Sequence, residues 1–242
     1  MKASNKLLAI VTAIILIFLV IYDLGLKAEY VKGDFRKRFY QMEQLSFKNF
    51  SNVRHNSADK VGIQIERGDK YQVWIKSDIK DRVVITQQGK TLLIQNNKEN
   101  ATQMWGYDDA IVIICPQIDS LTTVTDAETN DRKVDYKYAG FNQPTMVFGF
   151  NQPKLVLNLK KVTGVELIGN QIGDLQATVG DKVIGKAYLG SNAKNSIKQA
   201  DIQVPGKSEL KLSSPAIENF KYAISDSAKV TLTGKTLQLL KK

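Results

Sequence analysis

Five acidic side chains between residues 119 and 135 form the densest group in the sequence that could do chemistry. They are Asp119, Asp126, Glu128, Asp131 and Asp135. Paired carboxylates serve as acid and base in glycoside hydrolysis, and converging carboxylates bind Ca²⁺. The stretch lacks a turn glycine and the fixed ligand spacing of a calcium loop, so we favour a solvated acidic turn. We interpret the adjacent pair Asp108 and Asp109 in the same way, as part of a loop.

Few other reactive groups are present. His55 is the single histidine, and no nucleophile motif lies near it. The single cysteine, Cys115, excludes an intramolecular disulfide and a cysteine-based metal cluster. It lies in the apolar run AIVIICPQI (110–118), so we expect a small buried side chain. We therefore predict a protein that is not an enzyme, with no catalytic residue, no metal site and no cofactor.

Three aromatic residues in the first half are candidates for ligand contact. Trp74 alternates with the apolar residues on either side of it, so its ring faces the other side of a strand. There a tryptophan can stack on a sugar, or it can pack under the polar loop predicted over 96–109. That loop carries the other two candidates, Trp105 and Tyr107.

The tetrapeptide Phe-Asn-Gln-Pro occurs twice, beginning at Phe141 and at Phe150. Its prolines oppose pairing in a central strand at those points. We expect a pair of matched turns, with a binding loop that uses the two phenylalanines as the alternative.

The formal net charge of +10 indicates attraction to anionic surfaces such as headgroups, acidic glycans or nucleic acid. A lysine-rich solvated surface is the alternative, because the basic residues are scattered along the chain. No predicted helix could enter a nucleic-acid groove, and no basic stripe interleaved with aromatics occurs outside 27–44. We therefore predict that nucleic acid is not a partner.

Residues 7–22 form an uncharged apolar run of sixteen residues, about 24 Å long as a helix. A cleaved signal peptide needs small residues at its cleavage site, and Leu26-Lys27-Ala28 does not provide them. No cysteine follows the run, which excludes a lipoprotein anchor. We predict a cytoplasmic tail and transmembrane signal anchor over 1–26, with the anchor formed by side chains such as Leu7, Ile14, Phe18 and Tyr22.

The orientation of this anchor is not given by the flanking charges, because five basic residues follow it and two precede it. We predict a single-pass bacterial membrane protein whose main domain is periplasmic or extracellular, because the tail is short and the remaining chain is β. Residues 27–44 are a basic juxtamembrane linker, which either touches acidic headgroups or only connects the two parts.

From residue 45 the apolar residues alternate with period two, as in strands. Segments 61–75 and 82–95 each contain two such runs around a glycine turn and predict β-hairpins. Segment 110–118 predicts a strand buried on both faces, and 121–138 predicts strand, turn and strand. No helix of ten or more residues is predicted after residue 26.

Four similar phrases follow, at 155–169, 175–190, 202–214 and 222–234, each with two apolar pairs separated by turn formers. The first pairs are Leu157/Leu159, Ala177/Val179, Ile202/Val204 and Tyr222/Ile224; the second are Val165/Leu167, Ala187/Leu189, Leu210/Leu212 and Val230/Leu232. The first pairs repeat after 20, 25 and 20 residues. Such a period is typical of a β-solenoid in which each phrase forms one coil. The competing interpretation is an antiparallel sandwich.

The segment LSFKNFSNVRHNSADKVGIQIERGDKYQVWIKSD (45–78), followed by GKTLLIQ (89–95), resembles the entry motif of the bacterial head-GIN-domain family. Members of this family are also called auto-transporter adhesins, a role suggested from their architecture, and the family has no established activity. The resemblance runs from about residue 45 to 236 and implies a right-handed parallel β-helix-like fold, a cell-envelope location and an adhesive role, without catalytic residues. The family's Gly-Ser-Gly turns are approached here only at Gly190-Ser191.

We therefore predict an all-β protein, a right-handed parallel β-helix or solenoid with a hairpin-rich N-terminal half and one preceding transmembrane helix. The β domain spans 45–236, with hairpins over 45–149, solenoid coils over 150–236 and a tail over 237–242. The predicted function is non-catalytic adhesion to, or binding of, an envelope glycan or protein. A structural or signalling module that binds a protein partner is the alternative, and a polysaccharide-active enzyme is the third.

Overall fold

The computed structural model describes residues 2–58, 60–97, 107–125, 144–182 and 186–241. The chain divides into two compact units, Met1–Met42 and Glu43–Lys242. The first unit contains helix α1 (Ala3–Lys32) and the short 3-10 helix η1 (Asp34–Arg36). The described part of the second unit is mostly β, as the alternation predicts.

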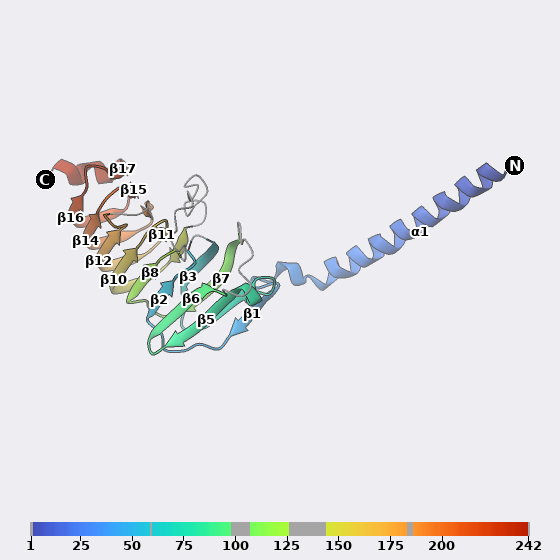
Figure 1. Cartoon of the computed structure of the whole chain (residues 1–242), viewed down its shortest axis with the longest axis horizontal. Coiled ribbons are helices and arrows are strands. Elements are labelled where there is room, and N and C mark those ends of the chain that lie inside the picture. Colours follow the sequence, from blue (N-terminus) through green and yellow to red (C-terminus); the bar gives the residue numbers. More distant parts are fainter. Residues whose placement is uncertain (1, 59, 98–106, 126–143, 183–185, 242) are drawn as a thin grey trace. The chain divides into compact units, whose positions relative to one another are not determined.

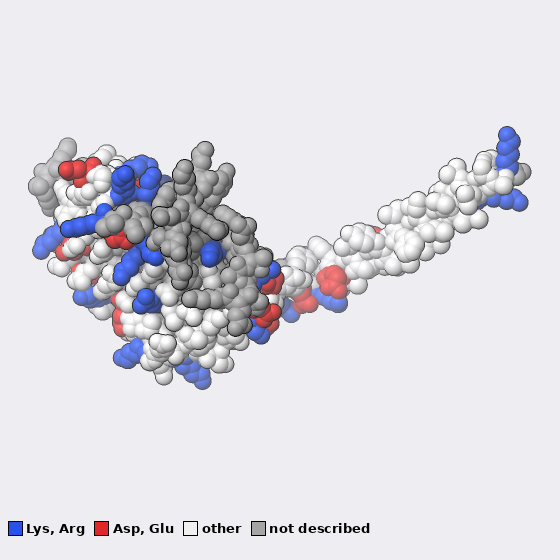
Figure 2. All heavy atoms as spheres, in the orientation of Figure 1, with Lys and Arg blue, Asp and Glu red and all other residues white. Residues whose placement is uncertain are grey.

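Helix α1 is the one helix in the described chain that is long and apolar enough to cross a membrane. Figure 2 shows a long uncharged stretch of this helix with charged side chains towards its ends. The helix continues six residues past the predicted end of the anchor, through a segment with the strong helix formers Lys27, Ala28 and Glu29. It stops at Gly33, whose left-handed conformation (φ 66°) closes the last turn.

The second unit consists of two mixed sheets, which we call sheet A and sheet B (Figure 1). Sheet B has the order β16-β14-β12-β10-β8-β2-β6-β5. Its strands are β2 (Asn52–His55), β5 (Val83–Gln88), β6 (Thr91–Asn96), β8 (Ser120–Thr123), β10 (Asn151–Leu159), β12 (Gln171–Val179), β14 (Ser196–Val204) and β16 (Ala216–Ile224).

Sheet A has the order β1-β4-β7-β3-β9-β11-β13-β15-β17. Its strands are β1 (Met42–Leu45), β3 (Val61–Arg67), β4 (Gln72–Lys76), β7 (Tyr107–Cys115), β9 (Thr145–Phe148), β11 (Gly164–Ile168), β13 (Tyr188–Ser191), β15 (Glu209–Ser213) and β17 (Lys229–Thr233). The 3-10 helices η2 (Lys80–Arg82) and η4 (Gly234–Lys241) complete the described elements.

Successive strands from β8 to β17 alternate between sheet B and sheet A, and each pairs in parallel with the strand two places further along. The register confirms the first set of repeated pairs, because Leu157 lies beside Ala177, Ala177 beside Ile202 and Ile202 beside Tyr222. Each predicted phrase therefore supplies one strand to each sheet, and the sandwich of antiparallel strands is not observed. The same parallel pairing extends back to β2 and β3.

One of the second pairs was predicted in the wrong register. Val165 and Leu167 lie beside Leu189 and Ser191, not beside Ala187 and Leu189. The reason is that this phrase carries a longer connection before β13, which moves the strand two residues along the chain. Ser191 is buried in an otherwise apolar row, and its hydroxyl accepts a hydrogen bond from Asn195 Nδ2 at 3.1 Å.

The hairpin predicted over 82–95 is confirmed by the antiparallel pairing of β5 with β6. The hairpin predicted over 61–75 is wrong, because β7 lies between β3 and β4 and pairs with both. The apolar strand β7 is buried at this central position, from Ala110 to Ile113. A Cβ atom at Gly68 would collide with the Ile114 side chain, so this glycine serves close packing against β7.

Apolar side chains from both sheets form one core. The stretch from Ala110 to Ile113 is buried at every position, so β7 is buried on both faces there, as predicted. Cys115 is fully buried, as expected, and burial raises the pKa of its thiol to about 12.

Two buried asparagines occupy the corners that follow β11 and β13. Asn195 Nδ2 donates to the carbonyl of Leu167 at 2.6 Å, and Asn170 Nδ2 donates to the carbonyl of Val147 at 2.9 Å. Each amide thus donates to a carbonyl at the end of a strand, and the Leu167 carbonyl also accepts from the Asn192 N–H at 3.4 Å.

Candidate functional site

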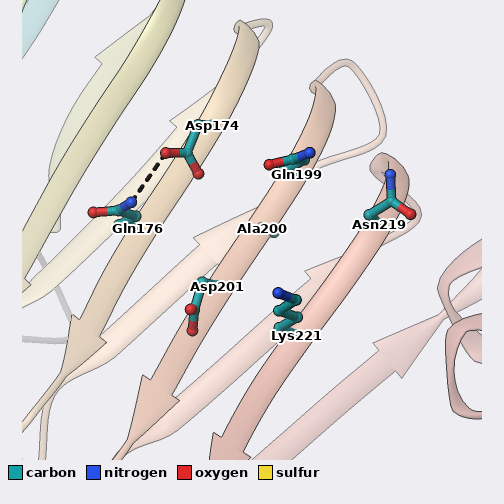
Figure 3. A pocket seen from close by; sticks show the side chains of 7 residues that line it. All are labelled: Asp174, Gln176, Gln199, Ala200, Asp201, Asn219 and Lys221. Carbon is teal, nitrogen blue, oxygen red and sulfur yellow. Dashed lines mark hydrogen bonds between the residues drawn. The ribbon is translucent and has the colours of Figure 1, made fainter.

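The candidate site is a groove on the outward face of sheet B, over β12, β14 and β16 (Figure 3). Its volume is about 440 Å³, within the ~300–1,000 Å³ common for ligand sites. Each strand contributes one outward pair, and the three pairs are Asp174 with Gln176, Gln199 with Asp201, and Asn219 with Lys221.

The parallel register places these six side chains in two rows. Asp174 lies beside Gln199 and Gln199 beside Asn219, whereas Gln176 lies beside Asp201 and Asp201 beside Lys221. Neighbouring strands are about 4.8 Å apart, so each row presents a polar group at that interval. The rows stay in register because Leu175 and Ala200, between them, point into the core.

Strict alternation is interrupted just before the groove. Ile172 is buried, yet Gly173 and Asp174 are both partly exposed, and Leu175 is buried again. Gly173 allows this local geometry because a Cβ atom there would lie 2.5 Å from the carbonyl oxygen of Pro153 on β10. Close backbone approach at Gly173 therefore places Asp174 at the groove edge.

The lining combines acceptors and donors with nearly balanced charge. Asp174 Oδ2 accepts a hydrogen bond from Gln176 Nε2 at 3.0 Å and lies 3.8 Å from Lys154 Nζ. Amide side chains can donate and accept, carboxylates accept and ammonium groups donate. Because Lys154 and Lys221 offset Asp174 and Asp201, the site suits a neutral ligand rich in hydroxyl or amide groups.

The structure does not bring Trp74 or Phe150 to this groove. Trp74 lies on β4 in sheet A; its ring is partly exposed, as alternation predicts, and Nε1 donates to Gln72 Oε1 at 3.4 Å. Tyr107 is the first residue of β7. Trp105 and Phe141 lie outside the described residues.

Phe150 is fully buried in the core and therefore cannot contact a ligand at the surface, so this prediction is corrected. Gln152 is also buried, and its amide pairs with the backbone N–H and carbonyl of Ile118. The predicted turn at Pro153 is wrong too, because this proline lies within β10. It is tolerated there because β8 pairs with β10 only from Val156 onward.

His55 has a structural environment. It is fully buried, its Nδ1 lies 3.4 Å from Thr145 Oγ1, and burial lowers its pKa to about 3. It is therefore neutral at physiological pH. Within the described ranges, no group of three or more His, Cys, Asp and Glu side chains could hold a metal ion. Of the five clustered acids, Asp119 is exposed, and the other four lie outside those ranges.

Sequence reasoning missed the groove residues although it aligned the strands that carry them. The apolar pairs predicted the register, and the alternate positions just before them are Asp-Gln, Gln-Asp and Asn-Lys in three successive coils. Comparison of these outward positions between successive coils would have revealed two polar rows. Their hollow shape could not be read from the sequence.

No protein-family model matches the chain, and no curated protein matches it. The fold is similar to that of a solved "putative lipid binding protein" from Parabacteroides distasonis, with 12% identity, coverage of 79% of this chain and 96% of that one, and a TM-score of 0.38. It is also similar to a "putative adhesin" from Bacteroides fragilis, with 13% identity, 78% and 95% coverage and a TM-score of 0.37. A "putative adhesin" from Parabacteroides merdae gives 8% identity, 78% and 92% coverage and a TM-score of 0.37.

Likenesses this distant assign neither a site nor a ligand. The head-GIN resemblance therefore remains a prediction.

Proposed function

We propose that this chain is a membrane-anchored envelope protein that binds a glycan, without catalysis, in the groove over β12, β14 and β16. The observation that carries the proposal is the pair of in-register polar rows made of amides, carboxylates and a lysine. A linear sugar polymer presents hydroxyl groups as both donors and acceptors along its length, and the parallel rows present complementary groups at regular spacing.

The same proposal places 1–26 in the membrane, uses 27–44 as a linker and gives the β domain, 45–236, a right-handed parallel β-helix. Its location is outside the cytoplasm. The length and exposed apolar surface of α1 support the anchor. Protease treatment of intact, outer-membrane-permeabilised and fully lysed cells tests the location: cleavage before full lysis supports it, and protection until full lysis contradicts it.

Glycan binding is tested with the full chain in nanodiscs against immobilised neutral and acidic envelope polysaccharides. We expect saturable binding to a neutral polysaccharide, reduced at least about tenfold by the double change Gln199→Ala/Asp201→Ala, equivalent to about 1.4 kcal/mol. Gln203→Ala is the matched control, because Gln203 is exposed on the same strand outside the groove lining. Equal binding by all three proteins would contradict the proposal, and release of new reducing ends would favour the enzyme instead.

A protein partner is the second candidate, because the last coil leaves apolar surface exposed. Tyr222 is 48% exposed and Leu237 52%, and the Phe220 and Tyr222 ring centroids are 5.1 Å apart. Both aromatic side chains occupy rows that are buried in the preceding coil at Ala200 and Ile202. A photo-crosslinker at Tyr222 would give one discrete adduct in cells if a protein partner covers the last coil. The absence of an adduct at this position would contradict a protein partner there.

A further inference from the structure

Directly after the apolar stretch of α1, three side chains form a compact group that we call the Arg36 cluster: Tyr30, Phe35 and Arg36. The Arg36 guanidinium carbon lies 5.3 Å from the Tyr30 ring centroid and 5.4 Å from the Phe35 centroid. The two rings are 5.6 Å apart, and Arg36 Nη2 donates to the Tyr30 hydroxyl at 3.0 Å. The left-handed Gly33 turns the chain so that these residues meet.

The cluster is exposed rather than buried. Tyr30 is 61% and Phe35 49% exposed. Exposed aromatic rings beside an apolar helix are characteristic of the membrane–water interface, where the ring is apolar and the hydroxyl is hydrated.

Its distance from the apolar stretch matches that interface. The apolar run 7–22 extends about 24 Å as a helix. With residues 23–26, which place Asp23 within about one turn of the headgroup layer, the span reaches about 30 Å, the thickness of the hydrocarbon core. Tyr30 lies four residues beyond Leu26, about 6 Å along the helix axis. The headgroup layer on each side of a bilayer is about 5–7 Å thick. Tyr30 and the residues packed on it therefore fall within the headgroup layer when residues 7–26 span the core.

The charges of this segment favour an anionic surface. Both of its acids are already paired, Glu29 with Lys32 and Asp34 with Lys37. Lys27 and Arg36 are basic residues in excess of these ion pairs. A guanidinium has about five donors, so the bond to Tyr30 leaves most of those of Arg36 for phosphate oxygens.

We propose that the Arg36 cluster is a lipid-binding site that docks on anionic phospholipid headgroups. The rings of Tyr30 and Phe35 lie in the membrane–water interface. Arg36 packs against both rings and binds headgroup phosphate. This inference rests on the membrane anchor of the proposed function and is independent of the glycan groove.

The test uses the full chain with Cys115→Ser, so that one introduced cysteine carries a bimane fluorophore. The labelled positions are Val31→Cys, beside the cluster, and Ile14→Cys, within the apolar stretch. Vesicles contain phosphatidylcholine alone or with phosphatidylglycerol, plus lipids with a nitroxide on either the headgroup or the acyl chain. We expect acyl-chain nitroxides to quench Ile14→Cys in both vesicle types and headgroup nitroxides to quench Val31→Cys, more strongly with phosphatidylglycerol.

The double change Lys27→Gln/Arg36→Gln is expected to abolish the extra quenching that phosphatidylglycerol produces at Val31→Cys. Arg54→Gln is the matched control, because Arg54 is exposed on β2 and outside this segment. Quenching at Ile14→Cys without headgroup quenching at Val31→Cys would overturn the lipid site and leave the anchor intact. Headgroup quenching at Val31→Cys that is equal with and without phosphatidylglycerol would also overturn the lipid site. Loss of quenching at Ile14→Cys would overturn the anchor and the inference together.

Discussion

Asn195 Oδ1 accepts hydrogen bonds from both nitrogens of Asn170, the backbone N–H at 2.8 Å and the side-chain amide at 3.1 Å. The two residues are 25 positions apart in the sequence and one coil apart in the structure. Asn170 Oδ1 in turn accepts from the backbone N–H of Phe150 at 2.9 Å. The buried amides therefore link three successive coils at one corner.

Asn195→Ala is expected to destabilise the second unit by about 3 kcal/mol. The change leaves the Asn170 N–H buried without its partner, and an unsatisfied buried group costs about 1–3 kcal/mol. It also removes the 2.6 Å bond to the Leu167 carbonyl, which keeps the bond from the Asn192 N–H at 3.4 Å. Urea unfolding followed by circular dichroism measures the loss. Asn158→Ala, on the outward face of β10, is the control and should stay within about 0.5 kcal/mol of the parent. Equal effects of the two changes would show that the corner network is not stabilising.

Stability is expected to fall as the pH drops below 6.5 because of His55. The folded state holds this imidazole neutral with a pKa of about 3, whereas the unfolded chain protonates it near 6.5. The contribution of neutral His55 to the free energy of unfolding is thus complete above pH 6.5. It is lost between pH 6.5 and pH 3, at about 1.4 kcal/mol per pH unit. Comparison with His55→Gln isolates it, since the difference in unfolding free energy between the two proteins must shrink in that window. A difference that does not vary with pH would refute this.

Gly173→Ala is expected to cost about 1–3 kcal/mol and to weaken glycan binding together with stability. The new Cβ atom would lie 2.5 Å from the Pro153 carbonyl oxygen, so β10 and β12 must separate next to Asp174. Thermal unfolding and binding are measured on the same samples. Gln171→Ala, an exposed position at the start of β12, controls for changes in this strand. An unchanged melting temperature would mean that the backbone relaxes freely at this point.

Cys115 is expected to resist thiol reagents in the folded protein at pH 8. Its side chain is fully buried, and burial raises the pKa of the thiol to about 12, so the reactive thiolate is scarce. Labelling followed by mass spectrometry should give modification only in denaturant. Rapid labelling under native conditions would indicate that β7 opens readily.

The coil architecture could be predicted from the sequence because apolar pairs that repeat every 20 residues are buried when the coils stack. Leu157, Ala177 and Ile202 do stack on one another. The hairpin predicted over 61–75 was wrong because local and distant strand pairing compete there. The turn at Gly68 favours a hairpin, but β7, some forty residues further along the chain, lies between the two strands. Sequence reasoning also missed the shift at Ser191, because buried Asn195 compensates a polar residue in an apolar row. The groove could not be predicted from the sequence, because it depends on how the side chains of β12, β14 and β16 lie together in three dimensions.

The most direct measurement of the central claim is amide hydrogen exchange of the full chain with and without the polysaccharide that binds most tightly. Binding in the groove predicts slower exchange concentrated in peptides that cover β12, β14 and β16, and unchanged exchange in β5 and β6 at the other end of sheet B. Protection confined to other strands, with β12, β14 and β16 unchanged, would contradict the assignment of this groove as the glycan site.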